Sequence, residues 1–345
     1  FYSVVGGWGV HYLIEALLGR AAVTDPSVMR GAFEAFAADP IQSVGSHVLF
    51  LSATAAVVLA GVEKGIERVG KILMPLLFIL MLVLIVRGLM LPGAMEGVKF
   101  LFKPDPEAFT GEALLNAMGF AFFSLSVGSG SMMNYGSYLS DKVSIGPSTA
   151  WIVCLAVMAS ILGGLMIMPA VFAFGLSPDA GPGLTFATMP AVFGRMPFGD
   201  IFAVAFFLCL FVAALTSAIS ILEMTSQHFV DRHGLKRRTS VLLVSTVLGL
   251  IGIVCALSFG PLSDVKLFGK TAFDLLDYVT SNIGMPIGCM GIAFVACFVS
   301  WKTTEAELSM NAFWRPWALR AFRLFAGILA PLLILVVAAK GIGLF

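Results

Sequence analysis

Two glycines and four hydroxyl side chains occur within ten residues of one apolar stretch. They form the string FFSLSVGSGS at residues 122–131. Glycine and serine weaken a helix, and a helix break at membrane depth is tolerated only against protein or a water-filled cavity. A broken helix would offer free carbonyls to a cation, and free N–H groups to a carboxylate. The same composition also suits a packing face, because small residues are common where membrane helices touch.

A second pair of hydroxyls lies in another apolar stretch. Thr216 and Ser217 follow Ala213 by three and four residues, so on a helix both hydroxyls share a face with the Ala213 carbonyl. Grouped oxygen atoms of this kind suit a hard cation. Ser and Thr also bond back to their own helix or across to a neighbouring helix. The spacing alone therefore fits either a cation site or ordinary helix packing.

Acidic side chains are scarce within the apolar stretches. Glu223 lies two turns after Thr216 and is the carboxylate deepest within a stretch. Burying a charge in a membrane is costly, so Glu223 is a candidate functional group, and Tyr138 is a candidate partner for it. Asp277 and Asp231 lie near the ends of their stretches, where contact with solvent is an equally good explanation.

These polar residues need a membrane-spanning scaffold to hold them. The 345 residues are 59% apolar and 12% charged, against about 45–50% and 25% in soluble domains. The apolar runs are continuous, which excludes a soluble fold and the alternating strands of a β-barrel. The net charge of +1 offers no basic surface for nucleic acid. Motifs of hydrolases and ATPases are absent, so we expect no enzymatic activity.

Nine apolar stretches of about 20 residues are predicted to cross the lipid bilayer as helices of one domain, residues 1–345. They are 1–18, 44–62, 72–91, 113–139, 149–174, 200–229, 240–258, 275–300 and 319–339. The loops 63–71, 141–147, 230–238 and 301–323 hold more than half of the Lys and Arg residues, so we expect them in the cytoplasm. The chain starts inside an apolar stretch, which suggests a fragment with helices missing before it.

Three strings in the same order resemble the bacterial branch of the neurotransmitter:sodium symporters, which have the leucine-transporter fold. They are residues 122–130, Gly65-Ile66-Glu67-Arg68 with Lys71 and Pro75, and AALTS at 213–217. The resemblance runs nearly end to end. It implies an all-α inverted-repeat fold of about eleven helices, of which these nine are the third to the eleventh. It also implies sodium-coupled import of an amino acid or related amine by alternating access, in a bacterial inner membrane, and it admits a homodimer.

The resemblance assigns roles to individual positions. The implied substrate-binding residues are Tyr2, Phe123, Ser124, Ser126, Ser129 and Ile221. Among them, Tyr2 would meet the substrate carboxylate and Phe123 would form an aromatic lid. The implied sodium ligands are Ala213, Thr216 and Ser217 at one site and Ser124 at another. The implied gate residues are Asp277 outside and Asp231 inside, with Tyr138 and Glu223 at interior network positions.

Other positions depart from the family pattern. Leu155 or Ala156 stands where the family's seventh helix usually offers a polar ligand to the first sodium. Phe120 and Ala159 occupy the positions linked to chloride, so we expect no chloride requirement. Because the missing helices would supply half the site, the alternative is a truncated or degenerate protein that does not transport, or a substrate sensor of the same fold.

Overall fold

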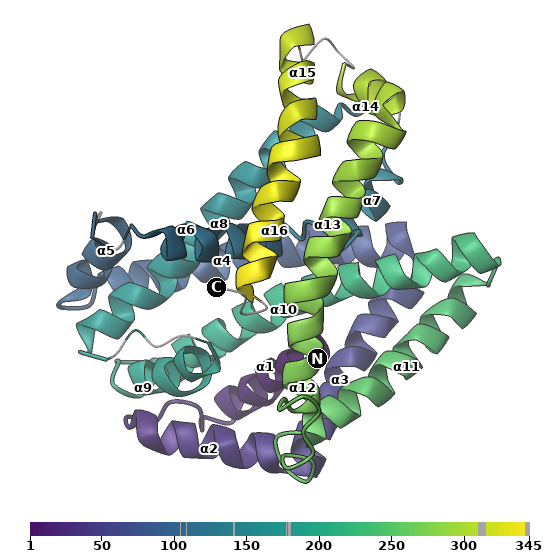
Figure 1. Cartoon of the computed structure of the whole chain (residues 1–345). Helices are drawn as coiled ribbons and strands as arrows, with labels where there is room; N and C mark the ends of the chain where they lie inside the picture. The colour runs from purple at the N-terminus through teal and green to yellow at the C-terminus, as the bar shows by residue number, and fades with distance from the viewer. Residues whose placement is uncertain are drawn as a thin grey trace. The chain divides into compact units, whose positions relative to one another are not determined.

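The computed structural model describes residues 1–103, 105–107, 109–140, 142–176, 178, 181–309 and 315–341, without the side chains of residues 63, 64 and 341. This part of the chain is mostly helical (Figure 1). Its β-structure is one isolated bridge between Leu267 and Lys270. The predicted all-α class is therefore confirmed for the described residues.

The helices follow one another closely along the chain. The α-helices are α1 (Tyr2–Leu17), α2 (Pro26–Ala38), α3 (Pro40–Leu59), α4 (Arg68–Leu89), α5 (Ala94–Phe102), α6 (Gly111–Ser124), α7 (Ser131–Gly136), α8 (Ile145–Ala173), α9 (Met189–Gly194), α10 (Gly199–His233), α11 (Arg237–Leu257), α12 (Ala272–Tyr278), α13 (Met285–Phe294), α14 (Trp301–Leu308), α15 (Pro316–Leu324) and α16 (Ala330–Gly341). The π-helical segments are η1 (Val62–Glu67), η2 (Leu184–Thr188), η3 (Val279–Gly284), η4 (Val295–Val299) and η6 (Phe325–Leu329).

Seven described helical runs are long and apolar enough to cross a membrane. They are Pro40–Leu59, Gly65–Leu89, Ile145–Ala173, Gly199–His233, Arg237–Leu257, Ala272–Val299 and Pro316–Lys340. Each overlaps one of the predicted stretches. The first predicted stretch forms the shorter helix α1, and the stretch 113–139 divides into α6 and α7. The break expected from the glycines and serines is present.

The chain forms two compact units, and each combines segments that are separate in sequence. Unit 1 comprises Phe1–Lys103 and Ile161–Leu275, and unit 2 comprises Pro104–Ser160 and Leu276–Phe345. Within unit 1, α1 packs on α3 and α10, and α11 packs beside α3 (Figure 1). The core of this packing is Val10, Phe50, Ala55, Val58, Leu215, Ala218, Ile219, Leu222, Val241 and Val244.

Glycines bring the backbones of α1 and α3 close together. A Cβ atom on Gly7 would lie 2.7 Å from the backbone nitrogen of His47, and one on Gly6 would lie 2.4 Å from the Phe50 ring. Real Cβ atoms do not approach other atoms so closely, so both positions require glycine. Small residues allow such approach because dispersion contacts drive helix packing within lipid. This packing fixes the start of α1, where Tyr2 lies.

In unit 2, polar side chains donate hydrogen bonds to backbone carbonyls of a π-helical segment, η4. The Thr304 hydroxyl donates to the Ala296 carbonyl at 2.9 Å, and Arg323 Nε donates to the Cys297 carbonyl at 3.0 Å. The Arg323 guanidinium also lies 4.9 Å from the centre of the Trp301 ring. The first bond ties α14 to η4, and the second ties α15 to η4.

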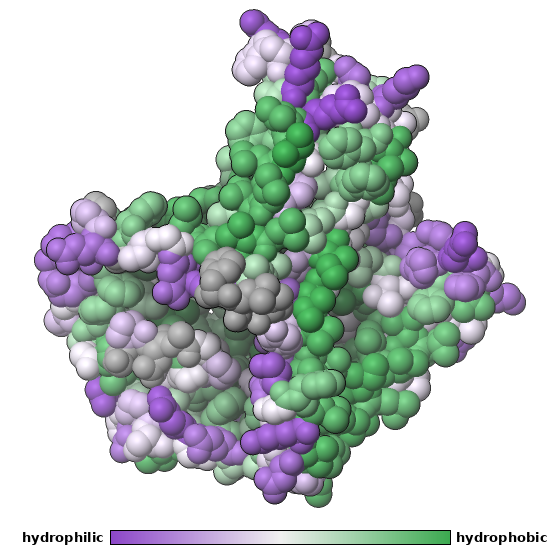
Figure 2. All heavy atoms as spheres, in the orientation of Figure 1, coloured by the Kyte–Doolittle hydropathy of each residue, from purple (hydrophilic) through white to green (hydrophobic). Residues whose placement is uncertain are grey.

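Apolar side chains cover the visible faces of α13 and α16 (Figure 2). Ile287, Phe294, Leu332 and Leu335 are all at least half exposed. Hydrophilic residues gather instead around α14, α15 and the turn between α10 and α11 (Figure 2). Apolar middles with polar ends are what a membrane requires of its spanning helices.

Candidate functional site

Helix α10 gathers the three oxygens that the spacing predicted. Thr216 Oγ1 donates to the Ala213 carbonyl oxygen at 3.0 Å, and Ser217 Oγ donates to the same oxygen at 3.2 Å. Both hydroxyls therefore lie on the carbonyl's side of the helix, as residues three and four positions apart must. A cation could take all three oxygens in place of these two back-bonds.

Tyr2 lies beside this cluster. Its hydroxyl lies near the Ser217 side chain. Its body packs on the core of unit 1, where α1 and α10 are in contact. The structure thus joins a residue predicted to bind substrate with a residue predicted to bind sodium. Ile221 lies one turn after Ser217 on the same face of α10, and it is 40% exposed.

The unwound segment between α6 and α7 carries the remaining hydroxyls. Helix α6 ends at Ser124 and α7 begins at Ser131. Ser126, Gly128 and Gly130 have positive φ angles of 52°, 92° and 85°, a region that glycine enters freely and serine rarely. The break therefore depends on backbone conformations that a regular helix cannot adopt.

Ser129 forms hydrogen bonds with residues on both sides of it in the unwound segment. Its hydroxyl oxygen lies 2.9 Å from the Ser126 carbonyl oxygen and 3.0 Å from Ser131 Oγ. It also accepts the Ser131 N–H at 3.3 Å, at the start of α7. Phe123 and Ser124, in the last turn of α6, are exposed on unit 2.

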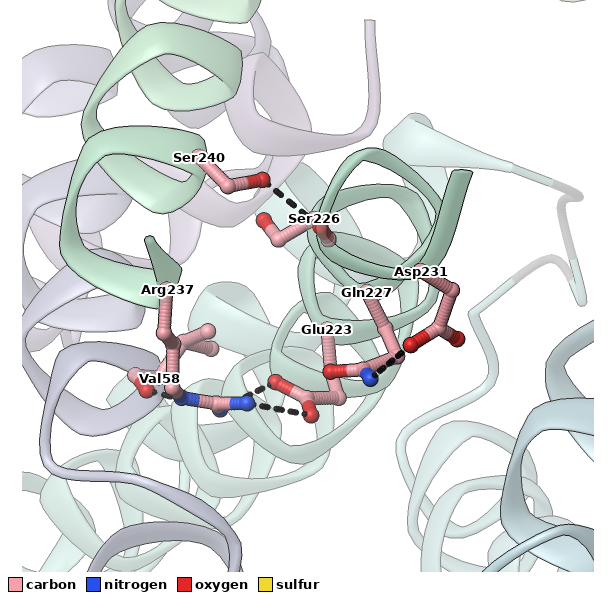
Figure 3. A network of polar contacts seen from close by, with 7 residues as sticks. All are labelled: Val58, Glu223, Ser226, Gln227, Asp231, Arg237 and Ser240. Atoms are coloured by element: carbon pink, nitrogen blue, oxygen red, sulfur yellow. Dashed lines mark hydrogen bonds and ion pairs between the residues drawn. The ribbon is translucent and has the colours of Figure 1, made fainter. Parts of the chain in front are cut away.

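Glu223 is fully buried and forms an ion pair with Arg237, whose side chain is 28% exposed (Figure 3). Arg237 Nη1 donates to Glu223 Oε1 at 3.0 Å, and Nη2 donates to Oε2 at 2.5 Å. Nη2 also donates to the Val58 carbonyl at 3.0 Å, in the last turn of α3. One guanidinium therefore ties together α3, α10 and α11.

Sequence reasoning missed Arg237 as the partner of Glu223. In the sequence, Arg237 is one of several basic residues of the predicted cytoplasmic loop 230–238. One feature of the sequence could have indicated this partner. Arg237 lies in the first turn of α11, the helix that follows the one carrying Glu223. Nearby, Ser240 Oγ donates to the Ser226 carbonyl at 2.6 Å, a second link between α10 and α11 (Figure 3).

The other predicted gate residues have local partners. Asp231 accepts a hydrogen bond from Gln227 Nε2 at 2.8 Å, one turn earlier on α10 (Figure 3). Asp277, on α12, accepts one from the Ser281 hydroxyl at 3.0 Å. Tyr138 follows α7, and its ring meets Tyr135 edge-on at 6.4 Å between ring centres.

Comparison with known proteins decides the family. A family model described as "Sodium:neurotransmitter symporter family" matches residues 39–343. The chain belongs to the sodium:neurotransmitter symporter family. This symporter is 41% identical over 308 residues to the "Uncharacterized sodium-dependent transporter YhdH" of Bacillus subtilis (strain 168), covering 89% of this chain and 68% of that protein. A Haemophilus influenzae protein, "Uncharacterized sodium-dependent transporter", is 32% identical over 318 residues, covering 91% of this chain and 70% of its own length.

A solved structure matches the symporter's fold. It is described as "Crystal structure of MhsT in complex with L-phenylalanine" and has a TM-score of 0.87 and 37% sequence identity. The match covers 99% of this chain and 77% of that chain. The predicted leucine-transporter-type fold is confirmed, and so is the prediction of a sodium-coupled symporter that spans the membrane several times.

Proposed function

We propose that this symporter imports an amino acid or a related small amine together with sodium. The main support is the cluster on α10, where the Ala213 carbonyl and two hydroxyls lie together beside Tyr2. Oxygen ligands hold a hard cation, and a phenol can donate to a carboxylate. The likeness to MhsT, solved with L-phenylalanine, supports the same class of substrate.

We assign the ion and substrate roles to each unit separately. In unit 1, Ala213, Thr216 and Ser217 bind sodium, Tyr2 binds the substrate carboxylate, and Ile221 contacts the substrate. In unit 2, Phe123, Ser124, Ser126 and Ser129 contact the substrate, and Ser124 also belongs to a first sodium site. The support is the break after α6, which frees backbone groups for an ion and for a charged substrate.

The gates are proposed on the acidic residues. Asp277 closes the outer side and Asp231 the inner side, while Glu223 and Tyr138 belong to the interior network. Alternating access requires contacts that form in one state and open in another. The bonds of Asp231 to Gln227 and of Asp277 to Ser281 are short-range and exchangeable, which suits that role.

Transport is proposed to proceed without chloride. Phe120 and Ala159, at the positions linked to chloride, have no polar side-chain group that could hold an anion. Some members of the family do depend on it by description: the Rattus norvegicus "Sodium- and chloride-dependent taurine transporter" is 28% identical over 260 residues, covering 68% of this chain and 39% of that protein. The apolar pair is the observation that supports transport without chloride.

Uptake by the complete protein in proteoliposomes tests the proposal. A panel of radiolabelled L-amino acids, including L-phenylalanine, is offered with an inward sodium gradient, with chloride present or replaced by gluconate. We expect uptake of at least one amino acid that collapses without the gradient and is unchanged in gluconate. Uptake that ignores the sodium gradient would refute the coupling, and a requirement for chloride would refute only the chloride proposal.

Replacing Thr216 by Ala, together with Ser217 by Ala, tests the ion site. The double variant removes two of the three oxygens, so sodium dependence should be lost. Thr225→Ala is the matched control, because Thr225 lies on the same helix and donates to the Ile221 carbonyl at 3.0 Å in the same way. If uptake by the double variant depended on sodium as strongly as uptake by Thr225→Ala, the α10 cluster would not be part of the sodium site.

A further inference from the structure

Gly288 of α13 meets Gly128 of the unwound segment, backbone against backbone, within unit 2. A Cβ atom on Gly288 would lie 2.2 Å from the Gly128 carbonyl oxygen. A Cβ atom on Gly128 would lie 2.2 Å from the Met285 carbonyl oxygen and 2.9 Å from the Cys289 nitrogen. Neither position can hold a side chain unless the backbone moves.

The two glycines are required for different reasons. Gly128 has a φ angle of 92°, so its conformation alone favours glycine. Gly288 lies inside α13 with helical geometry, where alanine is the better helix former by about 1 kcal/mol. Within the described part of the chain, the contact with Gly128 is thus what explains glycine at 288.

The contact falls in the middle of the segment that carries the candidate site. Ser126 precedes Gly128 and Ser129 follows it, and the Ser129 hydroxyl bonds to the Ser126 carbonyl. Left-handed residues at 126 and 130 flank the contact, so a regular helix does not stiffen the backbone there. The α13 backbone, against which the segment packs, therefore determines where the carbonyls and hydroxyls of the segment lie.

We propose that Gly288 is a positioning residue for transport, which seats the unwound segment and so fixes the Ser126 and Ser129 groups. The proposal rests on the assignment of these serines to the substrate site. Carbon and oxygen atoms in contact lie about 3.5 Å apart, so a methyl group at 288 must push the Gly128 carbonyl away by about 1 Å. A displacement of that size is enough to weaken substrate binding tenfold or more at a site that requires exact geometry.

The test compares Gly288→Ala with Gly291→Ala. Gly291 lies on the same helix, but a Cβ atom there meets nothing within 4 Å. Both variants are reconstituted and given the amino acid that the wild type transports fastest. We expect the half-saturating concentration to rise about tenfold or more for Gly288→Ala and to stay at the wild-type value for Gly291→Ala.

A purely structural role for Gly288 gives a different result. It would lower the melting temperature and the amount of folded protein, while the half-saturating concentration, which does not depend on that amount, stayed unchanged. This outcome would overturn the proposal. If Gly288→Ala yields no folded protein, Cys289→Val adds bulk beside Gly128 and should raise the half-saturating concentration in the same direction; an unchanged value would overturn the proposal equally.

Ser129→Ala separates this inference from the proposed function. If Ser129→Ala raises the half-saturating concentration and Gly288→Ala does not, only the positioning role fails. If neither variant has an effect while the wild type transports, the assignment of the unwound segment to the substrate site fails as well.

Discussion

A buried carboxylate in a membrane protein needs a partner, and Glu223 has one in Arg237. The guanidinium meets both carboxylate oxygens, and its third bond reaches the Val58 carbonyl. Bidentate geometry of this kind makes charge-assisted hydrogen bonds strong. The desolvation cost of the two charges is offset only while both are present.

Removing one partner should therefore destabilise the protein. For Glu223→Gln we expect a loss of roughly 3 kcal/mol, because the Arg237 charge loses its counter-ion. Glu67→Gln is the control, since the Glu67–Lys71 pair lies on an exposed turn and such pairs contribute little. Thermal unfolding of the detergent-solubilised variants measures both. Equal melting temperatures for the two variants would contradict a structural role for the Glu223–Arg237 pair.

Some single-residue features follow from sequence and others do not. The grouping of Thr216 and Ser217 on the Ala213 carbonyl follows from helix periodicity, because all three lie within one turn. The partner of Glu223 does not, because Arg237 lies 14 residues away and beyond a helix end. Which of several basic residues turns inward is decided by the packing of α3, α10 and α11.

At the scale of elements, the break between α6 and α7 was predictable, because glycine and serine weaken a helix wherever they cluster. The π-helical segment η4 was not, since its sequence VACFV is as apolar as the turns of α13 before it. The requirement for glycine at position 288 was also not predictable from the sequence. It arises from an approach between segments that sequence does not show to be neighbours.

The start of α3 provides a prediction about pH. Asp39 caps this helix by accepting the N–H groups of Ile41 and Gln42 at 2.8 and 3.0 Å. The backbone and side-chain hydrogen bonds from Gln42 lower the pKa of Asp39 below 3.8. A carboxyl with a lowered pKa in the folded state stabilises the fold above its unfolded pKa, and loses that effect as the pH falls through the folded pKa.

We therefore expect Asp39→Ala to have a lower melting temperature than wild type at neutral pH, and the difference to shrink below pH 3.8. Asp39→Asn keeps a capping acceptor without a titrating group, so its melting temperature should stay near that of wild type at neutral pH. Melting curves across the pH range measure these differences. A gap between wild type and Asp39→Ala that is independent of pH would contradict the role of the charged cap.

At the scale of the molecule, the basic loops predict the orientation in the membrane. Arg232 lies in the last turn of α10, and Asp264 lies in the loop after α11. In a Cys154→Ala background, which leaves only buried cysteines among the described residues, Arg232→Cys should react with an impermeant maleimide only after cells are opened. Asp264→Cys should react in intact cells. The reverse labelling pattern would show that the orientation is opposite to the predicted one.

The interleaving of the two units along the chain has a consequence for synthesis. Helices α1 and α3 leave the ribosome early, but the helices they pack on, α10 and α11, follow only after the first half of unit 2. His47 on α3 lies against the Gly249 carbonyl of α11 at 3.2 Å, so its ring has no such acceptor until α11 has been inserted. A nascent chain stopped before Gly199 therefore holds Tyr2 in place without the helix that brings Ser217 to it. Assembly of unit 1 is a late event in translation, and long-range pairings of this kind form slowly.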